Sequence, residues 1–166
     1  DVYTLWLTRG LANHAAPTLL RCVPMLPAAL LLFGMQPPVS MAAGAAWLVS
    51  LAAALVLSAA ISTLMAVLML WTISGEGIGR LMMIAMGVLS GMFVPLPLFP
   101  EWAQRVLNVL PYRGLVDIPH RLYLGDLPPS ALPRLLLFQG VWILAYVAGG
   151  RWLLAAGSKR LVVQGG

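Results

Sequence analysis

Charged side chains are scarce in this sequence. Of its 166 residues only 9% are charged, whereas 61% are hydrophobic, and the mean hydropathy is +0.92. Soluble domains carry about 25% charged residues, so this composition excludes an ordinary soluble domain and indicates an integral membrane protein. The 10 basic residues form no run longer than Lys159-Arg160. We therefore expect a lipid bilayer, and not a nucleic acid, around the chain.

Residue types that carry catalysis are also few. The single cysteine, Cys22, excludes an internal disulfide. His14 and His120, the two histidines, are expected outside the membrane spans, where neither could act as base for an intramembrane serine. No group of His, Cys, Asp and Glu has the spacing of metal ligands. The sequence therefore predicts neither an enzyme nor a metal site.

The phosphate-binding loop of ATPases, G-x-x-x-x-G-K-[ST], is missing as well. If ATP drives this protein, ATP and Mg²⁺ bind to a partner ATPase, and this chain holds no cofactor. The predicted spans contain no carboxylate, and the sequence shows no internal repeat. Coupling to protons or sodium within the chain is therefore not supported.

Long apolar stretches are what the sequence does have. Four approach the ~20 residues that a membrane helix needs: about 17–34, 41–71, 78–94 and 132–156. The first is the weakest because it contains Arg21, Pro24 and Pro27. We expect an all-α, polytopic transmembrane helix bundle forming a single domain over 1–166. The chain begins at Asp1 without a signal peptide, which indicates a fragment of a longer protein.

Small residues recur at four-residue intervals in two of these stretches. Gly87-x-x-x-Gly91 lies in the third, and Ser50, Ala54, Ser58 and Ser62 lie in the second. Such spacing lets helix backbones approach closely in a bundle or a dimer. General richness in alanine and glycine explains it equally well.

The region between the last two spans is rich in proline, and we expect Pro95 and Pro97 to end the third span. An amphipathic helix is expected over 100–110, but its 11 residues rise only ~16 Å and cannot cross a core of ~30 Å. It must lie in the interface or re-enter the membrane, and re-entry is favoured. After it, Arg113, Asp117 and Arg121 have the i, i+4 spacing of a charge network, or of a solvated helix face.

The stretch "SGMFVPLPLFPEWAQRVLNVLPYRGLVDIPHRLYLG", residues 90–125, resembles the membrane subunits of bacterial type-2 ATP-binding-cassette transporters, the ABC-2 permeases. The resemblance covers essentially the whole chain, which would contain the last four of about six spans. It implies the permease subunit of an exporter. This subunit forms the transport path with a second identical or different permease and is driven by a separate ATPase subunit. Alternatives are a non-transporting structural membrane protein and a secondary transporter.

The same resemblance implies that about 99–124 forms re-entrant helices that cap the path on the outer side. It places the ATPase at the cytoplasmic face of a bacterial inner membrane, with both chain ends in the cytoplasm, and the excess of basic residues on that side agrees. The residues expected to face the ATPase are Arg9, Glu76 and Arg80. The expected cap residues are Gly91, Pro95, Pro97, Pro100, Trp102, Arg105, Pro111, Arg113, Asp117, Pro119 and Arg121.

Overall fold

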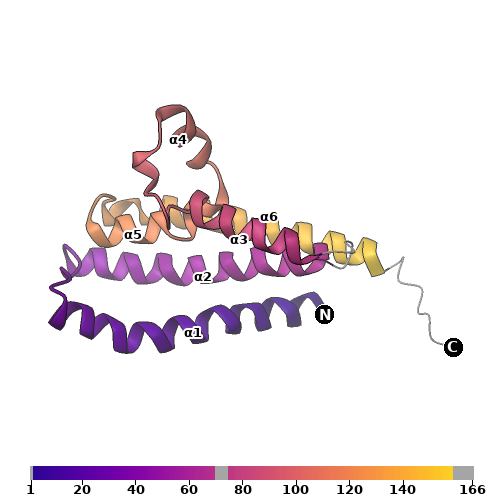
Figure 1. The fold of residues 1–166 in the computed structure, drawn as a ribbon, viewed down its shortest axis with the longest axis horizontal. Coiled ribbons are helices and arrows are strands. Elements are labelled where there is room, and N and C mark those ends of the chain that lie inside the picture. Colours follow the sequence, from indigo (N-terminus) through magenta and orange to yellow (C-terminus); the bar gives the residue numbers. More distant parts are fainter. Residues whose placement is uncertain (1, 70–74, 159–166) are drawn as a thin grey trace.

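The computed structural model describes residues 2–69 and 75–158, and all regular elements within them are helical, as predicted. Long helices form an elongated bundle, from which a short segment around α4 projects to one side (Figure 1). The elements, with 3₁₀ turns written η, are α1 (Val2–Leu32), α2 (Met41–Met69), α3 (Gly75–Leu89), η1 (Leu96–Leu98), α4 (Glu101–Leu107), η2 (Pro111–Gly114), α5 (Asp117–Leu124), η3 (Pro129–Ala131) and α6 (Leu132–Ser158).

Three helices in the described residues are long and apolar enough to cross a membrane: Val2–Leu32, Met41–Met69 and Pro129–Gly157. The first extends well before the expected 17–34 because the helix continues through its three prolines. A proline removes one backbone hydrogen bond, but a membrane helix tolerates it where neighbouring groups compensate. Next to Pro17, the hydroxyl of Thr18 donates to the carbonyl of His14 at 2.7 Å.

Helix α2 is the centre of the bundle, with its main contacts to α6, α1 and α5. Its small residues permit this, since Ser50 and Ala54 are fully or almost fully buried. A Cβ atom on Gly10 of α1 would lie 3.3 Å from the Thr63 hydroxyl and 3.6 Å from the Ala59 carbonyl, so the backbones of α1 and α2 are close. The small residues of α2 therefore serve helix packing within the chain.

The span expected at 78–94 is not one continuous crossing in the described residues. Helix α3 has 15 residues and ends at Leu89, which gives a rise of only ~22 Å. It lies beside the C-terminal half of α2, across a hollow that Gly79 and Met82 line together with Met65. The shorter α5 instead packs against the N-terminal half of α2.

Together α3 and α5 cover opposite halves of α2, like one crossing broken in the middle (Figure 1). The break is closed by a backbone hydrogen bond in which the Asp117 amide, at the start of α5, donates to the Ser90 carbonyl at 3.2 Å. The two helices have 15 and 8 residues, and their combined rise of ~34 Å matches a hydrocarbon core of ~30 Å. Residues 91–116 are inserted at the break.

Both ends of the described chain lie at the same end of the bundle (Figure 1). There Arg151 of α6 donates to the Thr4 hydroxyl of α1 at 3.3 Å. We call this the termini end. We call the opposite end, where the chain turns from α1 into α2, the hairpin end. There the Tyr123 hydroxyl of α5 donates to the carbonyl of Gln36 at 2.7 Å.

Candidate functional site

A glycine, and not a proline, ends α3. Gly91 has φ +85°, a left-handed conformation that glycine adopts without strain. The Met92 amide donates to the Gly87 carbonyl at 3.1 Å, and the Gly91 amide donates to Val88 at 3.3 Å. These two bonds form a Schellman motif. The expectation that Pro95 and Pro97 end this helix is therefore wrong, because the chain has already turned at Gly91.

The prolines instead begin the short elements that follow. Pro95 precedes η1 and Pro97 lies within it, Pro100 is the N-cap of α4, and Pro111 is the first residue of η2. Proline is suited to these places because its missing N–H would have no partner in the first turn. The Gly87-x-x-x-Gly91 pair also belongs to this turn, since a Cβ on Gly87 would collide with the ring of Phe93.

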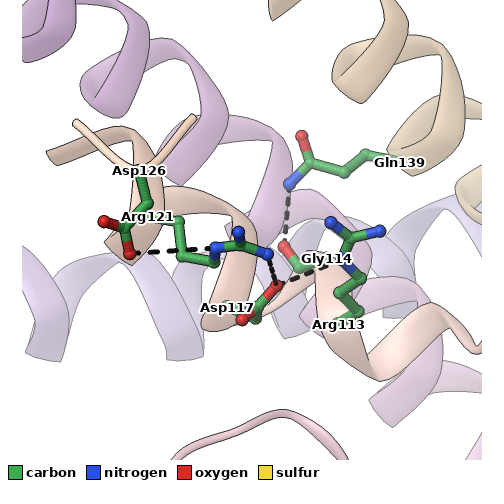
Figure 2. A network of polar contacts seen from close by, with 6 residues as sticks. All are labelled: Arg113, Gly114, Asp117, Arg121, Asp126 and Gln139. Atoms are coloured by element: carbon green, nitrogen blue, oxygen red, sulfur yellow. Dashed lines mark hydrogen bonds and ion pairs between the residues drawn. The ribbon is translucent and has the colours of Figure 1, made fainter. Parts of the chain in front are cut away.

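A buried carboxylate joins two arginines beyond these turns (Figure 2). The side chain of Asp117 is only 4% exposed, and its Oδ2 lies 3.0 Å from Arg113 Nε and 3.9 Å from Arg121 Nη1. The pairs expected from the i, i+4 spacing are therefore present. Arg121 also approaches Asp126, with 3.9 Å between Nε and Oδ2. We call Arg113, Asp117, Arg121 and Asp126 the charge network.

Gln139 ties the inserted segment to the long helices (Figure 2). It is fully buried in α6, and its Nε2 donates to the Gly114 carbonyl of η2 at 2.8 Å and to the Ser50 carbonyl of α2 at 3.1 Å. The Ser50 hydroxyl donates back to Gln139 Oε1 at 3.4 Å. Our sequence reasoning missed this residue, although a lone glutamine in an apolar span was a signal.

Helix α4 buries two of its apolar side chains and exposes the other two. It buries Ala103 and Leu107 against Leu96. Trp102 and Val106 are 74% and 57% exposed, and Val109, just after the helix, is 65% exposed.

The remaining predicted residues are scattered. Arg105 is exposed on α4, whereas Pro111 and Pro119 are buried. Arg80 is exposed on α3, toward the termini end, and Arg9 is exposed on α1. The side chain of Glu76 lies outside the described residues.

Two adjoining hollows lie in the half of the bundle nearer the termini end, between α1, α2 and α3. His14 Nε2 is 2.8 Å from Ser62 Oγ, and this pair lines both. The placement of His14 outside the spans is therefore wrong, because it lies in the middle of α1. The polar hollow has a volume of about 580 Å³ and is lined by Trp6, Arg9, Gly10, Asn13, His14, Ser62, Thr63 and Ala66.

The second, methionine hollow has a volume of about 370 Å³. Neither hollow is lined by a described carboxylate that could orient the imidazole of His14 for catalysis. The described residues also contain no group of His, Cys, Asp and Glu arranged to hold a metal ion. The lining of the methionine hollow is His14, Ser58, Ile61, Ser62, Met65, Ala66, Met69, Gly79, Met82, Met83 and Met86.

Comparison with protein families gives one match that spans nearly the whole chain. A family model described as "ABC-2 family transporter protein" matches residues 6–165. Comparisons with curated proteins and with solved structures gave no match.

Proposed function

Because this chain belongs to the ABC-2 family of transporter membrane proteins, we propose that it is the permease subunit of an ATP-driven exporter. A separate ATPase subunit supplies the energy, and a second permease, identical or different, completes the transport path. The three long apolar helices place the protein in a membrane as a multi-pass chain. In this proposal the chain transports and has no catalytic residue of its own.

The broken crossing formed by α3 and α5 is the observation that supports a transport path most directly. Irregular backbone at membrane depth is tolerated only where protein or trapped water satisfies its polar groups. In the inserted segment 91–116, side chains of α6 satisfy two such carbonyls. Gln139 donates to the Gly114 carbonyl, and the Trp142 indole of α6 donates to the Val109 carbonyl at 3.1 Å.

This segment acts as the outer cap of the path in our proposal. The charge network and the Gln139 bonds fix the end of this segment where it continues into α5. The exposed apolar residues of α4, among them Trp102, contact lipid or the second permease. A cap of this kind closes the path on one side until nucleotide binding in the ATPase shifts the bundles to the other state.

The ATPase docks, in this proposal, at the termini end. Arg9 lies in the first third of α1, and Arg80 follows Gly79, which lies next to Met69 at the end of α2. Both side chains are exposed, so an acidic ATPase surface can reach them. Positively charged residues concentrate on the cytoplasmic side of membrane proteins. We therefore place the termini end in the cytoplasm and the hairpin end outside a bacterial inner membrane.

Nucleotide hydrolysis by the purified assembly tests the proposal. The permease, isolated with its partners and reconstituted in nanodiscs, is expected to carry ATPase activity that vanadate inhibits. Replacing Arg80 by glutamate should weaken the binding of the ATPase while the permease stays folded. An assembled permease without ATPase activity would contradict the proposal, as would transport that persists without ATP and stops when the proton gradient is collapsed.

A further inference from the structure

The two hollows differ sharply in chemistry although they share His14, Ser62 and Ala66. Arg9 and Asn13 give the polar hollow a cationic group and an amide one helical turn apart. The methionine hollow is lined by the thioethers of Met65, Met69, Met82, Met83 and Met86. The first hollow thus carries more polar groups than the second, which it adjoins.

The charge of the polar hollow favours an anion. Arg9 is the one charged side chain among the described residues that line either hollow. It forms no salt bridge with an acidic side chain that the structure describes. A guanidinium presents several N–H donors in a planar fork that matches a phosphate or carboxylate. Asn13 and the His14–Ser62 pair add polar groups around the same space.

The methionine hollow suits a hydrocarbon chain. Methionine side chains are unbranched, flexible and polarizable, so they adapt to apolar groups of varied shape. Five of them converge here from α2 and α3, and Gly79 leaves room, with Met69 Cε 3.1 Å from where its Cβ would lie. The volumes of about 370 and 580 Å³ lie in the range typical of small-molecule sites.

We propose that the two hollows form one binding site for an anionic amphiphile. Its acidic head, a phosphate or a carboxylate, binds Arg9 and Asn13 in the polar hollow. Its aliphatic chain passes the His14–Ser62 pair and lies among the methionines. As an assignment of the substrate class, this inference rests on the proposed transport function, whereas the binding site itself does not.

Binding of defined lipids to the full-length chain in phosphatidylcholine nanodiscs tests the site. The probe is oleoyl lysophosphatidic acid with a photoactivatable group in its chain, and oleoyl lysophosphatidylcholine is the zwitterionic comparison. Arg9→Gln should raise the Kd of the lysophosphatidic acid about tenfold, the loss expected for a charge-assisted contact, and change that of the lysophosphatidylcholine less than about twofold. Arg9→Lys should have an intermediate effect.

Arg80→Gln is the matched control. It also removes one positive charge near the termini end, but Arg80 lines neither hollow. It should leave both affinities unchanged. Ala66→Phe, which places a ring where the hollows meet, should block photocrosslinking to peptides that contain Met82, Met83 and Met86. Inorganic phosphate should compete only weakly, because it lacks the chain.

Equal losses for Arg9→Gln and Arg80→Gln would overturn the site, because they would indicate attraction to the membrane surface in general. Inorganic phosphate that binds as tightly as the lipid would contradict an amphiphilic ligand, because the aliphatic chain would then add nothing to the affinity. Binding is measured without ATP, so its outcome is independent of the transport proposal. Arg9-dependent binding in an assembly that hydrolyses no ATP would support the site and contradict the exporter.

Discussion

The side-chain amide of Gln139 donates to the main-chain carbonyl of Gly114 at 2.8 Å, within the interior of the bundle. This bond joins the final long helix to the segment inserted between α3 and α5. Gly114 has no side chain to hinder the approach, and a Cβ there would lie 2.9 Å from Leu57 Cδ2 and 3.2 Å from Gln139 Cγ. The contact therefore depends on a glutamine at one position and a glycine at the other.

Replacing Gln139 by methionine keeps the length of the side chain and removes its donors. The carbonyls of Gly114 and Ser50 then lose the bonds that Gln139 makes to them. We expect the free energy of unfolding to fall by ~1–3 kcal/mol, as for buried polar groups left without a partner. Unfolding by SDS in mixed micelles measures the change.

The control is Leu144→Met on the same helix, where the side chain is 69% exposed and should change stability by less than ~0.5 kcal/mol. A Gln139→Met protein as stable as the parent would mean that the bonds to Gly114 and Ser50 contribute little.

Asp117→Asn should destabilise the protein where the inserted segment joins α5. It removes the carboxylate that pairs with Arg113 and Arg121, whose side chains are 18% and 28% exposed. Since water reaches both arginines in part, we expect a loss of ~1–3 kcal/mol, below the ~3–5 kcal/mol of a fully buried pair.

The same mixed-micelle unfolding measures the Asp117 variant against Asp126→Asn. Asp126 is 56% exposed, so its removal should cost less than ~1 kcal/mol. Similar losses for the two variants would show that the burial of Asp117 does not increase its contribution to the free energy of unfolding.

Gly91→Ala should destabilise the turn that ends α3. With φ at +85°, an alanine at this position costs about 1–2 kcal/mol more than glycine. Gly140→Ala is the matched control, because it lies within α6, has no positive φ, and has nothing within 4 Å of an added Cβ. That change should be neutral or stabilising by up to ~1 kcal/mol. Thermal unfolding in detergent compares them, and equal effects would contradict the role of Gly91.

The sequence predicts the membrane class and the long helices because these depend on composition and run length. The uncharged second stretch is α2, and the last is α6, with bounds within a few residues. The i, i+4 spacing of Arg113, Asp117 and Arg121 also predicts their pairing, because a helix brings such residues together whatever surrounds them.

The helix ends and distant contacts could not be predicted in the same way. Pro17 stands where the sequence places the start of the first span, yet α1 begins well before it, continues through it and packs against α2. In the sequence Gly91 is one small residue among many, and only its positive φ angle in the structure shows that it ends α3. Gln139 meets Ser50 across 89 residues of sequence, and no local pattern encodes such a partner.

Accessibility of single cysteines tests the proposed orientation. In a Cys22→Ser background, Asn108→Cys in the inserted segment and Asp126→Cys near the hairpin end should react with an impermeant maleimide added to intact cells. Both native side chains are exposed. Lys159→Cys, outside the described residues, should react only after the membrane is permeabilised, because the basic termini end is expected in the cytoplasm.

Reaction of Asp126→Cys and Lys159→Cys from the same side would contradict this topology. It would mean that α3 and α5 do not together traverse the membrane, although the Asp117 amide bonds to the Ser90 carbonyl between them. The inserted segment could then not cap the path from outside, and the ATPase could not dock at the end opposite to it. Protection of both cysteines until permeabilisation would contradict the orientation in the same way.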